Sequence, residues 1–216
     1  MVMKKNDWNA HYNEKKSILS YPDENLVRLI SNKINRSESL NDLAAIDIGC
    51  GSGRHIVLLN EFGIGKVYGS DYSLNALKLC QRLNLKNMTN CENRKMPFKD
   101  NTFDIAVAWG SLHYSSKDET HVMLNEIRRI LKEDGELFAT LRKDNDTYLK
   151  TGIDLGNNTW KTGLDDISGT VVSFFNESEI NKLFNSFGRF SYGWVERTII
   201  GDTGKVISHW IVSAKK

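Results

Sequence analysis

The chain has 216 residues, 40% of them hydrophobic and 26% charged, and this composition is typical of an ordinary globular domain with one substantial core. Its formal net charge of +2 gives no reason to expect nucleic acid or an anionic membrane as a partner. The basic start lacks the apolar run of a signal peptide, and no segment is long enough to cross a bilayer, so we expect a cytoplasmic protein.

Three cysteines occur, at positions 50, 80 and 91, and they form neither a CxxC pair nor a metal-ligand spacing. A disulfide framework and a zinc site are therefore not expected. Cys50 lies in a glycine-rich stretch without an evident basic partner, so a small residue that fits the turn is a simpler interpretation than a catalytic thiol.

Residues 1–40 are predicted to form an N-terminal cap. Their first part is polar with interspersed aromatic residues, among them Trp8 and Tyr12. Pro22 and Asp23 then mark a helix start, and apolar residues recur at positions 26, 30 and 34, which predicts an amphipathic helix over 23–35.

A glycine-rich stretch follows at residues 44–55, AAIDIGCGSGRH. This pattern predicts a strand over 43–48, a tight turn, and a helix over 55–62. A ligand can approach the backbone closely where side chains are absent, so we interpret the turn as a cofactor site. The glycines are spaced G-x-G-x-G rather than G-x-G-x-x-G, and a dinucleotide pyrophosphate therefore fits poorly.

A second strand and helix follow at once. The strand is predicted over 66–70, and Ser73 caps a helix that runs to about residue 83. Alternating strands and helices predict a parallel sheet covered on both faces. Asp71 ends the strand about twenty residues after the glycines, where a carboxylate can accept hydrogen bonds from both ribose hydroxyls of a cofactor. The alternative is an aspartate that merely initiates a turn, with Tyr72 as a surface neighbour.

The glycine-rich stretch and a later one, residues 91–104, resemble motifs of a known family. Asp47 precedes the first glycine by two residues, so the loop reads D-x-G-x-G-x-G, which resembles the first motif of the class I S-adenosylmethionine (SAM)-dependent methyltransferases. Residues 91–104, CENRKMPFKDNTFD, resemble a third motif of one subgroup, with its Met-Pro-Phe and Asp-x-x-Phe-Asp elements. The resemblance covers residues 44–141, and it implies SAM as cofactor and S-adenosylhomocysteine as product.

The resemblance also implies a set of cofactor-binding residues. The glycine loop would take the amino-acid and ribose portions of SAM, with Asp47 organising the methionine end. Glu92 or the backbone of Asn93 would read the adenine amino group, with Met96 or nearby apolar atoms under the ring. Residues expected to contact the cofactor are Asp47, Gly49, Cys50, Gly51, Gly53, Asp71, Tyr72, Glu92, Asn93, Trp109, and, as a cover, Trp8 and Tyr12. For the last two, plain core packing is the alternative.

The rest of the chain continues the α/β pattern. A buried strand is predicted over 103–109, a helix from Ser116 to about 131 with Val122, Ile127 and Ile130 facing inward, and a fifth strand over 136–141. Residues 142–175 lack clear periodicity and are predicted to form a substrate lid within the domain. A capped helix over 176–187 and a hairpin over 189–214 complete the chain.

The predicted fold is therefore a single domain, residues 1–216, of the α/β class. It has a Rossmann-like, doubly wound, mostly parallel sheet of seven strands that ends in an antiparallel hairpin. A hairpin of this kind is what the methyltransferase fold would supply as its last two strands, whereas a nicotinamide-dependent dehydrogenase would continue with further strand–helix units. We expect a monomer or a homodimer.

Methyl transfer from SAM requires the protein mainly to align a nucleophile and to exclude water. A base is needed only where the nucleophile arrives protonated. His113 and Tyr114 are the candidate catalytic residues, because they follow the fourth strand and the unperturbed pKa of histidine lies near neutrality. The alternative is a packing or positioning role, and His11 and His209 are weaker candidates.

The absence of certain sequence patterns narrows the chemical class of the methyl acceptor. The loop after the fourth strand, residues 108–111, lacks the Pro-Pro-aromatic signature of enzymes that methylate nucleic-acid bases, and it lacks an aspartate that would hold a divalent metal. No basic stripe with interleaved aromatic residues is present. The expectation is therefore a metal-independent methyltransferase acting on oxygen or nitrogen of a small molecule. A macromolecular acceptor, a SAM-binding protein without turnover, and a nicotinamide-dependent oxidoreductase are the alternatives.

Overall fold

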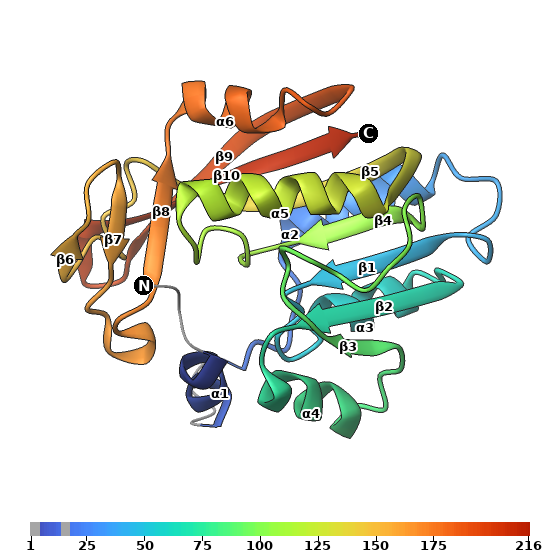
Figure 1. Cartoon of the computed structure of the whole chain (residues 1–216), viewed down its shortest axis with the longest axis horizontal. Coiled ribbons are helices and arrows are strands. Elements are labelled where there is room, and N and C mark those ends of the chain that lie inside the picture. The colour runs from blue at the N-terminus through green and yellow to red at the C-terminus, as the bar shows by residue number, and fades with distance from the viewer. Residues whose placement is uncertain (1–4, 14–17) are drawn as a thin grey trace.

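The structure is a computed structural model that describes residues 5–13 and 18–216. Its main sheet is mostly parallel, as the sequence predicted, and the strands follow the order β3-β2-β1-β4-β5 with the antiparallel pair β10 and β9 beyond β5 (Figure 1). The bounds of these strands are Ala44–Ile48 (β1), Lys66–Asp71 (β2), Met88–Asn90 (β3), Phe103–Ala108 (β4), Leu131–Lys143 (β5), Arg189–Ile199 (β9) and Asp202–Lys215 (β10).

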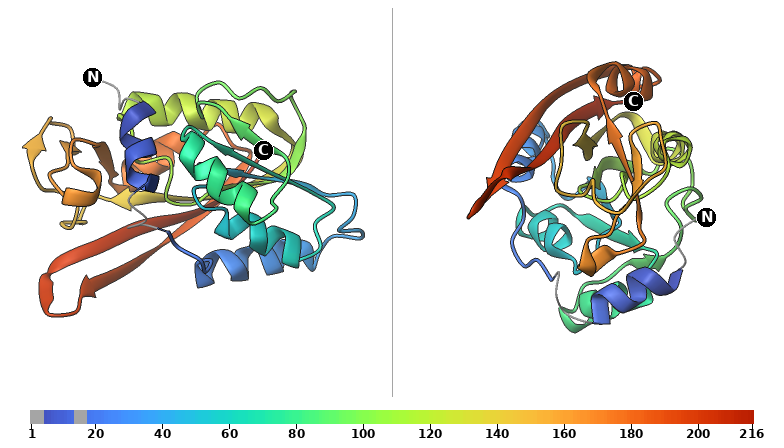
Figure 2. Two further views of the ribbon diagram at one scale, coloured as in Figure 1. Left: turned by 90° about the horizontal axis from the view of Figure 1, so that it is seen from below. Right: turned by 90° about the vertical axis from the view of Figure 1, so that its left-hand side faces the viewer.

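Two apolar clusters cover the two faces of this sheet. Successive residues of a strand point to opposite faces, so Ile46 packs in one cluster and Ala45 in the other. Helices α5 (Lys117–Ile130) and α6 (Glu177–Phe184) contribute to the first cluster, and α2 (Glu24–Ile34), α3 (Arg54–Glu61) and α4 (Leu74–Arg82) contribute to the second. Figure 2 shows the helices on both sides of the sheet, which confirms the doubly wound arrangement.

The helix starts are set by side-chain caps that the sequence predicted. Ser116 and Asn176 each form a reciprocal capping box with the glutamate three residues later. Ser73 accepts a hydrogen bond from the Ala76 amide, and Asp23 accepts one from the Asn25 amide.

One prediction about α5 is wrong. Val122 is 47% exposed, whereas its neighbours Met123 and Leu124 are buried together with Ile127 and Ile130. The apolar stripe of α5 therefore runs through positions 123, 124, 127 and 130, which is the spacing of one helix face, and Val122 lies just outside it.

Residues 142–175 hold more regular structure than their composition suggested. They form β6 (Ile153–Asp154), β7 (Thr159–Lys161), the short 3-10 helix η1 (Asp165–Ile167) and β8 (Val171–Phe175). Strand β8 pairs in parallel with the end of β5, so the sheet has ten strands in the described part of the chain rather than the predicted seven. Strands β6 and β7, of two and three residues, carry no detectable alternation in sequence, and β8 has five residues of which four are consecutively buried, so it shows no alternation either.

A further helix, α1 (Lys5–Asn13), was not predicted from its polar sequence. Its Asn9 side-chain oxygen accepts a hydrogen bond from Ser73 Oγ at 2.9 Å, and its backbone oxygen accepts one from Asn75 Nδ2 at 2.9 Å. These bonds hold α1 against the start of α4, near the carboxyl end of β2.

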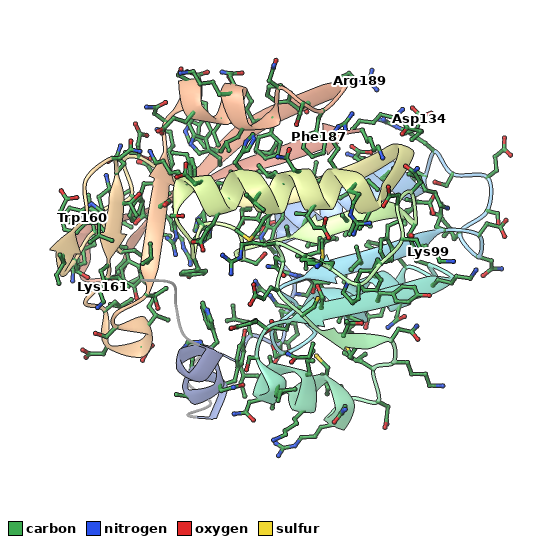
Figure 3. All side chains as sticks on the ribbon, in the orientation of Figure 1. Lys99, Asp134, Trp160, Lys161, Phe187 and Arg189 are labelled. Atoms are coloured by element: carbon green, nitrogen blue, oxygen red, sulfur yellow. The ribbon has the colours of Figure 1, made fainter. Side chains whose placement is uncertain are left out.

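The lid and the far end of the sheet lie at opposite sides of the molecule. In Figure 3, Trp160 and Lys161 mark the lid, whereas Lys99 and Asp134 mark the other end. The strands β1, β2 and β4 point toward the lid side (Figure 1). Ligands of open parallel sheets bind beyond the carboxyl ends of the strands, so residues 142–175 lie at the end of the sheet where a ligand is expected. We keep the name lid for these residues, and their role as a lid stays a prediction. Among the helices that are described, none has both the length and the hydropathy required to span a membrane.

Candidate active site

A cavity of about 640 Å³ lies at the carboxyl ends of β1, β2 and β4. It collects predicted cofactor residues from four separate stretches of the chain, namely Trp8, Tyr12, Gly49, Asp71, Tyr72, Glu92 and Asn93. We call it the first cavity. Residues more than eighty positions apart in the sequence therefore meet in one site.

The glycine loop has the geometry that only glycine adopts without strain. Gly49, Gly51 and Gly53 have φ of 69°, 54° and 89°, in the left-handed region. A Cβ at Gly51 would lie 2.5 Å from Tyr12 Oη, and one at Gly49 would lie 2.5 Å from Ser111 Cβ. The backbone therefore passes close to its neighbours at the wall of the cavity, and larger residues would close that space.

Asp71 joins the loop to the end of β2. Its Oδ2 accepts a hydrogen bond from the Gly51 amide at 2.9 Å, and its Oδ1 accepts one from the Ser73 amide at 2.7 Å. Burial raises the pKa of this carboxyl to about 6, against the opposing effect of the two amides. Each carboxylate oxygen has two lone pairs, so the ionised group retains acceptor capacity toward the cavity.

The expected adenine end holds an acceptor without a partner. Asn93 Oδ1 is buried and has no hydrogen-bond partner among the described residues. Glu92 instead pairs with Arg94 Nη2 at 2.8 Å, and Arg94 Nη1 pairs with Glu119 at 2.8 Å. Met96 is buried in the hydrophobic core and does not line the cavity, so the nearby apolar atoms are the remaining candidates for the contact under the ring.

A second cavity, of about 710 Å³, adjoins the first. The two cavities share a wall made by five residues, Trp8, Tyr12, Gly49, Gly110 and Tyr114. The second cavity is further lined by residues 142–167, which include η1, by the hairpin of β9 and β10, by the glycine loop and by residues 19–23. The site is therefore divided into two neighbouring chambers.

The remaining predicted cofactor residues lie at or behind the second cavity. Cys50, Gly51 and Trp109 line it. Asp47 is buried behind the loop with its Oδ2 at 3.6 Å from His55 Nδ1, and Gly53 faces Leu85. Within the described chain, Asp47 and Gly53 line neither cavity.

Aromatic side chains form the shared wall. The ring centroid of Trp8 lies 5.2 Å from that of Tyr114 and 6.3 Å from that of Tyr12. Burial, followed by the nearby Asp71 carboxylate, raises the pKa of Tyr12 well above its usual value, so its hydroxyl keeps its proton. Trp8 and Tyr12 thus lie between the chambers rather than in the core.

The two candidate catalytic residues differ in their access to the chambers. Tyr114 lines both cavities, whereas His113 lines the second alone. Burial, and then the charge of Arg142, lower the pKa of His113 well below its usual value, so the imidazole is neutral near pH 7. Such a ring can donate or accept a hydrogen bond but holds an abstracted proton weakly.

The sequence analysis missed several residues of the second cavity. Arg142 ends β5, Arg197 lies on β9, and Tyr148 lies in the lid. Arg142 could have been found from its place after the fifth strand, at the edge where ligands bind. Arg197 and Tyr148 have no such local signal.

Comparison with known proteins is consistent with this geometry. Residues 46–139 match the family model described as a methyltransferase domain. The structure of the Burkholderia thailandensis 1,6-didemethyltoxoflavin-N1-methyltransferase, solved with 1,6-didemethyltoxoflavin and S-adenosylhomocysteine, superposes with a TM-score of 0.70 over 98% of this chain and 86% of that one, at 16% identity. The chain has the fold of the SAM-dependent methyltransferases.

Sequence relatives of this methyltransferase-fold chain match only its central part. An uncharacterized protein of Methanocaldococcus jannaschii is 36% identical over 127 residues, which cover 58% of this chain and 52% of that protein. The human protein named arginine-hydroxylase NDUFAF5, mitochondrial, is 35% identical over 98 residues, which cover 45% of this chain and 28% of that protein. The chain thus spans about half, or less, of the length of these relatives.

Proposed function

We propose that the protein is a SAM-dependent methyltransferase that methylates an oxygen or nitrogen atom of a small molecule without a metal ion. The observation that carries the proposal is the pair of chambers with one shared wall. The first chamber presents the Asp71 carboxylate and the unpartnered Asn93 oxygen, and residues of the predicted lid line the second.

The first chamber suits SAM in its donors and acceptors. Asp71 retains lone pairs for the two ribose hydroxyls, and the buried Asn93 Oδ1 can accept a hydrogen bond from the adenine amino group. A buried acceptor without a partner is costly, and the exocyclic amine would satisfy it. The resemblance of residues 91–104 to the third motif also implies an adenine contact in this segment, through Glu92 or the backbone of Asn93, whereas the structure favours the Asn93 side chain.

The shared wall suits the reaction. The sulfonium methyl group must approach the nucleophile to about 3 Å in line with the breaking carbon–sulfur bond. Gly110 has no side chain, and no atom lies within 4 Å of the place where a Cβ would be, so the wall is open at that position. The neutral His113 and Tyr114 are then placed to orient the acceptor, and a nucleophile that arrives unprotonated needs no stronger base.

A concave chamber beside a predicted lid favours a small acceptor over a macromolecule. The lid, which includes η1, and the hairpin contribute residues to the lining of the second chamber, and concave sites of this kind are typical of small-molecule ligands. A macromolecule, such as a protein side chain, is the alternative acceptor. The human relative is named an arginine-hydroxylase, and one fold can carry different reactions. Metal independence is part of the proposal, since the described residues hold no group of three or more His, Cys, Asp or Glu side chains that could bind a metal ion.

Thermal unfolding of the purified protein with SAM, S-adenosylhomocysteine or NADH tests the cofactor. A ligand at a hundred times its dissociation constant stabilises the fold by about 2.7 kcal/mol, which raises the midpoint by a few degrees. We expect stabilisation by the two sulfur compounds alone. Stabilisation by NADH alone would contradict the proposal.

Turnover is tested by incubation of the protein and SAM with small acids, phenols and amines, and separately with a peptide mixture. Formation of S-adenosylhomocysteine together with a methylated small molecule is the expected result. Methylation of peptides alone would favour the macromolecular alternative. Binding of SAM without turnover on any acceptor would favour a SAM-binding protein.

A further inference from the structure

The floor of the second cavity is a face of three paired strands. Arg142 of β5 lies opposite His209 of β10, which lies opposite Val195 of β9. Two residues along the hairpin, Ile207 lies opposite Arg197, and side chains two residues apart share a face. The cavity lining includes all five of these residues. Two guanidinium groups and an imidazole are therefore presented on one wall.

Several nitrogen atoms at this wall lack partners. Arg142 is 7% exposed, and its Nε has no hydrogen-bond partner among the described residues. Neither ring nitrogen of the buried His113 makes a well-formed hydrogen bond, although the Thr140 backbone lies close to it. Buried polar groups are nearly always hydrogen-bonded, and these atoms belong to residues that line one cavity, so they indicate a ligand with complementary atoms.

The existing partner of Arg142 fixes the guanidinium without covering Nε. Asp146 Oδ2 accepts from Arg142 Nη1 at 2.6 Å and from the Ser208 amide at 2.9 Å. Asp146 Oδ1 accepts from the Leu149 amide at 3.2 Å. The fork is thus held rigidly by a carboxylate that is itself anchored, and such a preorganised fork suits a planar anion.

Positive charge dominates this wall. Burial, and then the charges of Arg142 and Arg197, together lower the pKa of His209 to about 3, so the imidazole is neutral. Two carboxylates also line the cavity, Asp23 and Asp166, but they come from the N-cap of α2 and from η1, not from the strand floor. Asp146 is thus the carboxylate that the contacts place on the Arg142 guanidinium.

We infer that the second cavity recognises an acceptor that carries a carboxylate group, bound by Arg142 with support from Arg197, while His113 and His209 exchange hydrogen bonds with it. Apolar lid residues, Leu149, Leu164 and Ile167, line the same cavity and would contact the hydrocarbon body of the acid. This inference rests on the proposed function, because it names the acceptor class of the same site. It assigns specificity to residues outside the cofactor loop.

The experiment measures binding of matched probes to the protein saturated with S-adenosylhomocysteine. The probes are benzoate and phenylacetate, each paired with its neutral amide, and calorimetry or ligand-observed NMR gives the affinities. We expect the acids to bind more tightly than the amides by at least about tenfold, because a charge-assisted hydrogen bond to a buried guanidinium is lost in the amides.

Two variants locate the effect. Arg142→Lys keeps the charge and a partner for Asp146 but removes Nε, and it should reduce the acid preference by about tenfold. Arg197→Gln, on an exposed part of the hairpin, should reduce it by about twofold to fivefold with no risk to the core. Arg128→Lys, on the exposed face of α5, is the matched control and should bind the acids as the native protein does.

Each outcome bears on the inference. Equal or tighter binding of the amides, or no binding of either acid at millimolar concentration, overturns it. A loss of S-adenosylhomocysteine affinity in Arg142→Lys also overturns it, since Arg142 would then hold the carboxylate of the cofactor itself. If the native protein binds neither SAM nor S-adenosylhomocysteine, the proposed function fails, and the acid preference is then measured on the protein without cofactor, where its absence overturns the inference separately.

Discussion

The two chambers of the site are built in different ways. The first is assembled largely from short motifs at the ends of adjacent parallel strands, such as Gly49 after β1 and Asp71 at the end of β2. The second combines the glycine loop with the end of β5, the lid and the hairpin, whose members Arg142 and Arg197 lie far apart in the chain. Local spacing therefore specifies most of the cofactor half, whereas the pairing of distant segments supplies the further residues of the acceptor half.

The largest expected effect concerns the cofactor half alone. Asp71→Ala removes the acceptor of two ribose hydroxyls, and we expect SAM to bind more than about tenfold more weakly, a loss of roughly 1.4 kcal/mol or more. Calorimetry measures the affinity, with Asp202→Ala in the hairpin turn as the control. An unchanged dissociation constant would refute the ribose assignment.

Acidification should also weaken SAM binding to the cofactor half. The pKa of Asp71 is raised to about 6, so the carboxyl gains a proton as the pH falls from 7 to 5 and then no longer accepts both hydroxyls. We expect SAM affinity to fall about tenfold over this interval, because a single required carboxylate loses ionisation at that rate. Calorimetry across the pH range measures it, and Asp71→Asn should give a nearly flat profile. A native profile as flat as that of the variant would show that Asp71 is not the group that titrates.

A substitution in the acceptor half should lower turnover without changing SAM affinity. His113→Ala removes a neutral ring that lines the second cavity, and we expect turnover to fall about tenfold while SAM affinity changes less than about twofold. Steady-state kinetics and calorimetry on the same preparation separate the two effects. Undiminished turnover would leave His113 as a packing residue.

The smallest effects should come from the shared wall, where the two halves meet. Trp8→Leu keeps an apolar side chain but removes the indole that contacts Tyr114, and we expect both SAM affinity and the KM of the acceptor to worsen by about twofold to fivefold. An effect confined to one ligand would show that the wall belongs to one chamber only.

The cofactor half was largely predictable from sequence because its signals are local. Left-handed glycines, a carboxylate at a strand end and a serine cap are each recognisable within a few residues, and the structure has Asp71 and Ser73 in those places. The doubly wound fold followed from alternating periodicities. Whether the lining residues contact SAM remains a prediction.

The acceptor half was not predictable because its determinants are distant or irregular. Strands of two or three residues in the lid show no alternation, and β8 joins the sheet only through a pairing with the end of β5. The polar α1 has no strong apolar face, and its position depends on the bonds that Asn9 makes with Ser73 and Asn75. Val122 was misplaced because it lies just outside the helix face formed by positions 123, 124, 127 and 130.

The position of α1 has a kinetic consequence. One short helix contributes Trp8 and Tyr12 to the wall of both chambers, and it is fastened to the residues that follow Asp71 by the hydrogen bonds of Asn9. We expect the binding or release of either the cofactor or the acceptor to move this shared wall and so to affect the other ligand. We therefore expect an ordered cycle in which a bound acceptor prolongs the residence time of the cofactor, and in which departure of the spent cofactor, rather than methyl transfer, sets the pace of turnover.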